Sequence, residues 1–441
     1  MGFMSLAAYH RVLALPGVRS LTLLGVLARI PHTAISMVLT LHVVLSLDRG
    51  YGDAGLVVGA FTVGAAVGAP WRGRAVDRLG LRRALVPSLV VEAMVWSTAP
   101  WLPFQALVGA VVLAGLLGLP VFTVIRLSLS VLVPEPQRRT AYALDSMAVE
   151  GSFMVGPALG VLVATHGSTT VAMMLLGGST VVAGIALMVV NPPTRSAAAA
   201  PAVASAREPA GRRAGRVPVS AALLAVLGAT AAATLVLAGT DVAIVAELRG
   251  HDALDLTGLI MVAWCGSSLL GGLVYGAAPR GVPPLALLLA LAALTVPIGL
   301  ASSPLVLALA VLPAGALCAP LISATAEAVA RLVPERVRGE AMGWHGSALT
   351  AGSAAGAPVA GFAIDAVAPW AGFAVVGSAG AVLAVIGLAL VAIHRRHAGA
   401  ARQESAGAGT PVPDVRAVLP RQQTREASAQ TTEPVSFSPG P

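Results

Sequence analysis

Four ionisable side chains stand deep inside apolar stretches of the sequence: Arg29, His32, Glu150 and Asp241. An arginine and an aspartate can form an ion pair, which a second charge can break. A histidine, whose pKa is ordinarily about 6.5, and a carboxyl group in an apolar setting can each take up and release a proton. We expect these four residues to line a pathway for protons or a charged solute, with Arg29 paired to Asp241.

A second pair of opposite charges, Arg126 and Glu327, lies at nearly matching positions in two other apolar stretches. The sequence is compatible with a salt bridge between them that closes one end of such a pathway. The alternative is local, because Glu327 and Arg331 are four residues apart and would meet on one helix.

The chemistry of an enzyme is missing from the sequence. We find no clustered nucleophile and base, no metal-ligand triad and no glycine-rich phosphate loop, so we expect no enzymatic activity, cofactor or metal site. The two cysteines, Cys265 and Cys318, are expected to be packing residues. The net charge is +8, but its basic residues are not interleaved with aromatic ones, which argues against nucleic acid as a partner.

The elements that must position these residues are apolar helices. Hydrophobic residues make up 56% of the chain and charged residues 11%, against about 25% charged in soluble proteins. Crossing a hydrocarbon core takes roughly 20 helical residues. The sequence predicts an all-α integral membrane protein with twelve transmembrane helices, near residues 18–46, 54–71, 84–100, 104–131, 140–165, 169–190, 219–247, 256–278, 284–302, 304–331, 339–366 and 370–394.

Arginine is the chain's basic residue throughout, and its distribution predicts the orientation. With the N-terminus in the cytoplasm, only Arg49 and Arg249 fall in loops on the outer side, while Arg29 lies within the first helix. The positive-inside rule then places both termini in the cytoplasm of a multi-pass plasma-membrane protein, with the lipid bilayer as a partner.

The chain contains an internal repeat. At an offset of 200 residues, LVPEPQRRTAYA (132–143) aligns with LVPERVRGEAMG (332–343), and at an offset of 203, residues 55–73 align with 258–276. This predicts two pseudo-symmetric six-helix bundles, 1–190 and 219–396. We expect a cytoplasmic linker at 191–218 and a disordered cytoplasmic tail at 397–441.

A charged stretch, GRAVDRLGLRR (73–83), carries the most specific signal. Its spacing resembles the signature G-x3-D-R-x-G-x-R-R of the major facilitator superfamily, through Gly73, Asp77, Arg78, Gly80, Arg82 and Arg83. The resemblance implies a cytoplasmic loop between helices 2 and 3 that acts as a conformational latch, with Asp77 accepting from the N-terminal amides of a facing helix. Arg280 occupies the equivalent position in the second half, so the latch would be one-sided.

The predicted fifth helix resembles the antiporter motif of drug:proton exporters in that superfamily. Gly156, Pro157 and Gly160 match it, whereas Ala143, Ser152 and Val161 replace glycines. The same small residues also suit close packing of two helices, so both interpretations stay open. An arginine that such exporters often carry in helix 4 is replaced here by Val111.

The resemblance implies a secondary transporter that works by alternating access, most plausibly a monomer. We expect proton-coupled efflux of a small organic compound, with the proton gradient as energy source. Import of a metabolite by the same superfamily and a non-transporting membrane sensor are the alternatives.

Overall fold

The structure is a computed structural model that describes residues 3–195, 217–253 and 256–407. Over these residues every regular element is an α-helix or a short 3-10 helix. The chain divides into two units, Met1–His394 and Arg395–Pro441. The first unit contains all but one of the helices in full, and α16 (Pro369–Gly407) runs from it into the second.

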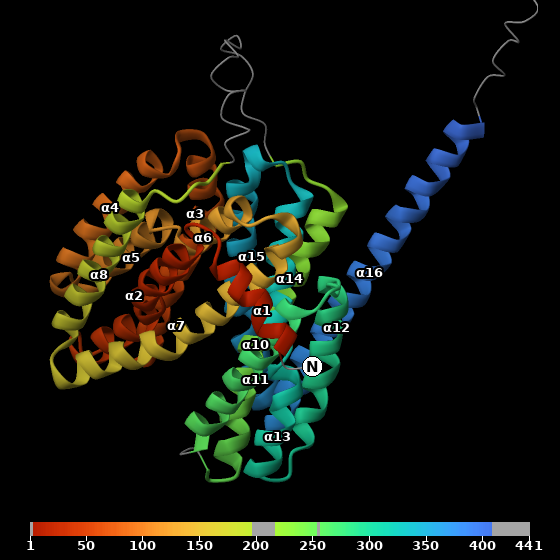
Figure 1. The fold of residues 1–441 in the computed structure, drawn as a ribbon. Helices are drawn as coiled ribbons and strands as arrows, with labels where there is room; N and C mark the ends of the chain where they lie inside the picture. The colour runs from red at the N-terminus through yellow and green to blue at the C-terminus, as the bar shows by residue number, and fades with distance from the viewer. Residues whose placement is uncertain (1–2, 196–216, 254–255, 408–441) are drawn as a thin grey trace, which may run out of the picture. The chain divides into compact units, whose positions relative to one another are not determined.

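The first half of the chain forms one group of helices (Figure 1). It consists of α1 (Phe3–Leu13), α2 (Val18–Leu45), α3 (Tyr51–Leu79), α4 (Leu81–Thr98), η1 (Ala99–Trp101), α5 (Phe104–Leu117), α6 (Val121–Leu132), η2 (Glu135–Gln137), α7 (Arg138–His166) and α8 (Thr169–Val190).

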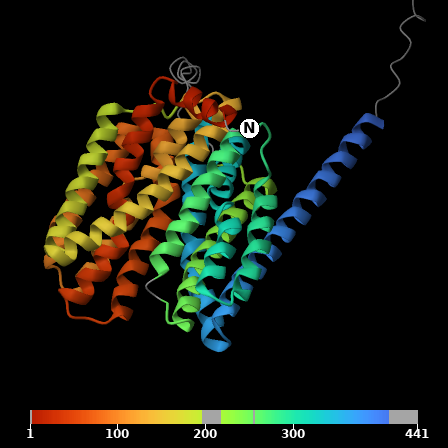
Figure 2. The same cartoon turned by 60° about the horizontal axis from the view of Figure 1, so that its bottom comes forward.

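The second half forms the other group, which Figure 2 shows beside the first. It consists of α10 (Ala221–Gly250), α11 (Thr257–Ala277), α12 (Pro284–Thr295), η4 (Val296–Leu300), α13 (Pro304–Gly315), α14 (Cys318–Leu332), η5 (Glu335–Val337), α15 (Arg338–Ala366) and α16.

The helices agree with an all-α membrane fold. Ten segments in the described chain are long and apolar enough to span a membrane. Shorter helices occupy the remaining two predicted spans: α4, which carries Arg82, Arg83 and Glu92, and the apolar segment Pro284–Leu300. Leucine, valine and alanine side chains form the core of each group, as expected where helices meet in an apolar solvent.

The internal repeat is visible in the secondary structure. The turn η2 and the helix α7 recur as η5 and α15, shifted by 200 residues at each start. The fourth and tenth predicted spans are each broken in two, at 118–120 and at 316–317. The equivalent helices therefore share their bends as well as their order.

The break between α5 and α6 explains two charged residues of the first half. Pro120 cannot donate a backbone hydrogen bond, and the break frees neighbouring backbone groups that must be satisfied inside a membrane. Arg72 donates to the carbonyl oxygen of Gly115 at 2.5 Å, and Glu92 accepts from the amide of Leu119 at 3.3 Å. Both side chains thus stabilise a broken helix.

Three features differ from the sequence prediction. The helix α3 continues through Pro70 and Gly73 to Leu79 and ends at Gly80, where φ is +76°. The helix α1 was not predicted from the sequence, since it is too short to span a membrane. The helix α16 extends beyond residue 396 to Gly407, while most of the predicted linker (196–216) and tail (408–441) lie outside the described residues.

Candidate functional site

The helices of the two halves share a common pair of ends. The turns at 80, 133–137, 278–283 and 333–337 lie at one end, which we call the arginine-rich end; the turns at 46–50, 167–168, 251–253 and 367–368 lie at the opposite end. Successive spans run in opposite directions, so alternate turns must lie at the same end of the molecule. The site is described from the arginine-rich end inward.

Asp77 joins the two halves at this end. Its carboxylate accepts hydrogen bonds from the amides of Gly339 at 2.9 Å and Glu340 at 2.8 Å, in the first turn of α15. The residue before α15, Val337, supplies no side-chain cap of its own. Asp77 therefore caps α15 from the other half of the molecule, where a negative charge also meets the positive end of the helix dipole.

The residues around Asp77 strengthen the same contact. A Cβ at Gly73 would overlap the carbonyl oxygen of Gly339, so glycine is needed for close approach. Gly73 itself lies within the helix α3 and not in the turn that follows it. Arg74 donates to Glu340 through Nε at 3.0 Å.

The other motif residues lie further out. Gly80 makes the turn after α3, as predicted from its residue type. Arg78, Arg82 and Arg83 are exposed, and Arg82 donates to the carbonyl oxygen of Met188 at 2.9 Å.

The repeat-related contact lies between α11 and α7 and uses the reverse chemistry. There Arg139 and Thr140, in the first turn of α7, donate to the carbonyl oxygens of Ala278 and Gly276 at the end of α11. Tyr9 of α1 donates to the carbonyl oxygen of Gly272 at 2.7 Å. Burial raises the pKa of Tyr9, so its hydroxyl remains a donor. In Figures 1 and 2, α1 accordingly lies across the junction of the halves.

A buried charge cluster lies one to two helical turns deeper. Asp145 of α7 binds Arg29 of α2 at 2.5 Å and Arg126 of α6 at 3.1 Å. Arg29 also lies over the ring of Phe122, with its Cζ 5.1 Å from the ring centre. One carboxylate thus faces two guanidinium groups, and each of the three residues is at most 3% exposed.

The cluster extends into the second half through a histidine. Arg126 donates to Nδ1 of His345 at 3.2 Å, and Nε2 of His345 lies 3.0 Å from the hydroxyl oxygen of Thr325. Since arginine has no acceptor, Nδ1 must accept and the ring proton resides on Nε2. Protonation of His345 would place an N–H group against a guanidinium group and break this link.

Asp145 compensates part of the positive charge of a buried cluster. Removing one partner of a buried ion pair typically costs about 3 to 5 kcal/mol, because the remaining charge stays uncompensated. Here the loss of Asp145 would strand two arginines, and the Nε of Arg29 already lacks a partner. The predicted pairing of Arg29 with Asp241 is therefore wrong, since Asp145 takes that place.

Asp241 and Glu150 form a separate acidic pair. Their charges interact electrostatically, and both act on the thiols of Cys265 and Cys318. Glu150 accepts from the hydroxyl of Ser268 at 2.8 Å and from the thiol of Cys318 at 3.2 Å, across the two halves. In the described part of the chain, neither acid has an arginine or histidine ion-pair partner.

His32 lies beside the buried cluster without joining it. Its ring contacts Phe122 edge to face at 5.4 Å between centroids and Phe61 at 6.3 Å. The side chain is half-buried, and no hydrogen bond to its ring is found within the described residues. Its nitrogens are therefore available to a solute or a proton.

Arg126 and Glu327 do not pair. Glu327 instead lies 3.7 Å from Arg331 and 3.9 Å from Arg139, so the local alternative describes it correctly. The repeat places Ala326 opposite Arg126, and one residue along a helix turns the side chain by about 100°. Glu327 consequently faces α7.

The predicted packing motif joins α7 to α2 within the first half. A Cβ at Gly156 would overlap the hydroxyl of Thr33, and one at Gly160 would come within 3.0 Å of Val38. Pro157 lies within α7. Gly352 and Gly356 repeat this pattern where α15 packs on α10.

Contacts between the halves are confined to the arginine-rich end. Along α7 they involve residues from 139 to 150, and along α15 residues from 338 to 347; Ser347 donates to the carbonyl oxygen of Ala66. Among described residues, the hydrogen bonds and ion pairs nearer the opposite end stay within one half. Within the described residues, the hydrogen bonds and ion pairs between the halves thus lie between the arginine-rich end and the middle of α7 and α15.

Sequence reasoning missed three residues that matter here: Asp145, His345 and Tyr9. A signal existed for the first. Asp145 lies seven and eleven residues before Ser152 and Gly156, hence on the same face of α7 that packs on α2. The other two depend on which helices meet across the halves, which helical periodicity does not encode.

Comparison with known proteins agrees with this arrangement. The human organic anion transporter MFSD10 (TETRAN) has a similar structure, with a TM-score of 0.60 at 17% identity, covering 85% of this chain and 99% of that one. The E. coli fucose:proton symporter FucP gives 0.63 at 14%, covering 85% and 98%. A bacterial homologue of the iron transporter ferroportin in an outward-facing state gives 0.66 at 13%, covering 85% and 99%.

Sequence comparison completes the assignment. None of the curated proteins matches this chain. The sequence model of the Major Facilitator Superfamily, in contrast, matches residues 21–304 and 279–431, which together cover most of the chain. With its repeated helical halves and the Asp77 contact, the chain belongs to the Major Facilitator Superfamily.

Proposed function

We propose that this protein is a secondary transporter that exports a small organic compound in exchange for protons, by alternating access at the plasma membrane. The observation that carries the proposal is the acidic pair Glu150 and Asp241. Two carboxyl groups without a cationic partner, at the inner limit of the contacts between the halves, suit proton uptake and release.

The confinement of contacts to one end supports alternating access. In this state the halves are fastened at the arginine-rich end, and release of Asp77 from α15 would allow that end to open. The arginine distribution supports a cytoplasmic location for that end and for both termini. Glu150 bridges the halves by accepting from Ser268 and Cys318, so a change in its charge would alter this contact during the movement.

The resemblance of the α7 motif to exporters favours efflux as the direction. The packing role of Gly156 and Gly160 is compatible with import as well, so direction has to be measured. Purified protein in liposomes, with an imposed pH gradient and a panel of organic compounds, gives both the direction of flux and its proton dependence.

The decisive variants are Glu150→Gln and Asp241→Asn, with Asp53→Asn as the matched control, because Asp53 pairs with Arg49 on the exposed surface of the opposite end. We expect the first two to abolish gradient-driven flux while retaining exchange of the compound, and the control to transport normally. Gradient-driven flux that survives in both variants would refute proton transfer through this pair. Uptake in place of extrusion would establish the importer.

A further inference from the structure

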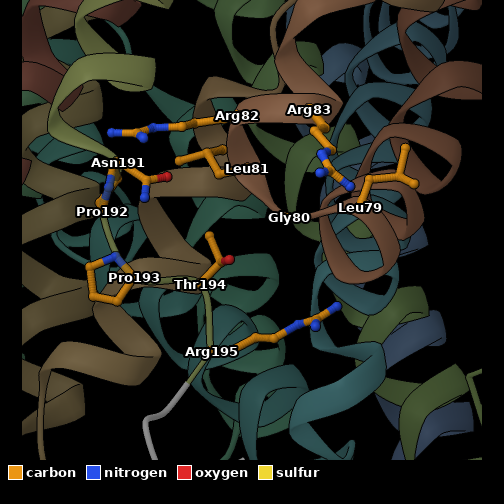
Figure 3. A pocket seen from close by; sticks show the side chains of 10 residues that line it. All are labelled: Leu79, Gly80, Leu81, Arg82, Arg83, Asn191, Pro192, Pro193, Thr194 and Arg195. Carbon is orange, nitrogen blue, oxygen red and sulfur yellow. The ribbon is translucent and has the colours of Figure 1, made fainter. Parts of the chain in front are cut away.

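A pocket of about 370 Å³ lies at the arginine-rich end, outside the contacts described so far. The turn from α3 to α4 forms one side, and the segment 191–195 that follows α8 forms the other (Figure 3). Three arginines line it, Arg82, Arg83 and Arg195, together with Asn191. None of the lining residues is acidic, so their positive charge is uncompensated within the pocket.

The start of α4 adds backbone donors. The helix has 18 residues, begins at Leu81 directly after Gly80, and has neither a side-chain cap nor an acidic residue in its first turn. Its first amides therefore lack intrahelical acceptors and carry the positive end of the helix dipole. Such a helix start attracts phosphate and other oxyanions.

Thr194 provides an independent observation. Its side chain is only 9% exposed, lines the pocket, and has no hydrogen-bond partner in the described part of the chain. Figure 3 shows it between the Gly80 turn and Arg195, with the hydroxyl directed into the space between the two segments. The hydroxyl of this largely buried side chain has no partner within the described residues, so it can hydrogen-bond to a ligand in the pocket.

We infer that this pocket binds a phosphate group, held by Arg83, Arg195, the hydroxyl of Thr194 and the first amides of α4. Arginine matches phosphate oxygens with paired N–H donors, and a tetrahedral anion can accept from several directions at once. Because the site lies where lipid headgroups meet the helix ends, the group can belong to an anionic phospholipid or to a soluble phosphate. The site adjoins the latch, since Arg195 also attracts Asp77 electrostatically.

The test uses the purified full-length protein, stripped of lipid in detergent, and two probes. Inorganic phosphate is titrated calorimetrically at constant ionic strength, and phosphatidylglycerol binding is counted by native mass spectrometry against phosphatidylcholine. The variants are Arg83→Gln, Arg195→Gln and Thr194→Val. The matched control is Arg280→Gln, which removes an exposed arginine at the same end of the other half.

We expect one bound phosphate-bearing ligand per chain and about tenfold weaker binding in each arginine variant, with a smaller loss in Thr194→Val. Binding of phosphatidylglycerol alone identifies the headgroup as the source, and binding of inorganic phosphate identifies a soluble one. Absence of both, or an equal loss in Arg280→Gln, would overturn the inference.

Discussion

Two repeat-related contacts hold the halves together, and they satisfy helix ends in opposite ways. Between α3 and α15, the carboxylate of Asp77 caps the N-terminus of α15. Between α11 and α7, the side chains of Arg139 and Thr140 cap the C-terminus of α11. The two repeat units therefore meet at equivalent helices, but Asp77 satisfies a helix N-terminus at one contact, whereas Arg139 and Thr140 satisfy a helix C-terminus at the other.

The difference between the two contacts affects how readily the arginine-rich end opens. The carboxylate of Asp77 makes two charge-assisted hydrogen bonds to amides of one helix turn, whereas the second contact has one charge-assisted bond, from Arg139, and one from the neutral hydroxyl of Thr140. We expect the α3–α15 contact to dominate the stability of the closed arginine-rich end. Substitutions at the two contacts test this ranking, from the largest expected effect to the smallest.

The largest effect is expected for Gly73→Ala. The added methyl group would overlap backbone atoms of Gly339, which cannot move aside as a side chain can. Overpacking of this kind costs about 1 to 3 kcal/mol. The equilibrium between the closed and the open arginine-rich end would shift roughly tenfold to hundredfold towards the open state. Distances between spin labels at Glu135 and Arg336 report the shift.

The repeat-equivalent substitution, Gly276→Ala, tests the second contact. Its new methyl group meets side chains, those of Tyr9 and Ala143, and not backbone atoms. We expect a smaller shift there. Gly55→Ala, with open space around it on the same helix, controls for the substitution itself. An equal response of Gly73→Ala and Gly55→Ala would contradict the close approach.

Asp77→Asn comes next. The substitution keeps the shape and one acceptor oxygen but removes the charge, at a cost of about 1 to 2 kcal/mol. The closed population should fall about tenfold, while thermal unfolding changes little. A variant that unfolds at a much lower temperature without opening would assign Asp77 a folding role instead.

Arg139→Gln is expected to shift the same equilibrium only about threefold. Its hydrogen bond to Ala278 is lost, but the ion pair with Glu327 is long at 3.9 Å and partly exposed, and such pairs contribute at most about 1 kcal/mol. Label distances in this variant, compared with those of Asp77→Asn, rank the two contacts. A larger shift in Arg139→Gln would reverse the ranking.

The smallest effect is expected for Tyr9→Phe. The aromatic ring stays, and only the hydrogen bonds of the hydroxyl to the carbonyl oxygens of Gly272 and Leu273 are lost. Hydrogen exchange at the end of α11 should increase while α3 and α15 remain protected. Unchanged hydrogen exchange in α11 would show that α1 does not stabilise the contact between the halves.

The sequence allowed the spans, the repeat and the Asp77 contact to be predicted, because hydropathy, a constant offset and residue type carry them. It did not allow the partner of Arg29 to be predicted. Depth along a helix favoured Asp241, because Asp145 lies nearer the arginine-rich end of α7, and only the packing of α7 on α2 brings Asp145 to Arg29. Likewise Glu327 has the depth of a partner for Arg126 but faces another helix.

The most direct test of alternating access is a pair of distances measured in one variant. Spin labels on non-natural amino acids, which leave Cys265 and Cys318 untouched, are placed at Glu135 and Arg336 for the arginine-rich end, and at Arg49 and His251 for the opposite end. In Asp77→Asn the first distance should lengthen while the second shortens. If both distances lengthen together, or neither changes, the contact between Asp77 and α15 does not control an alternation between two closed ends.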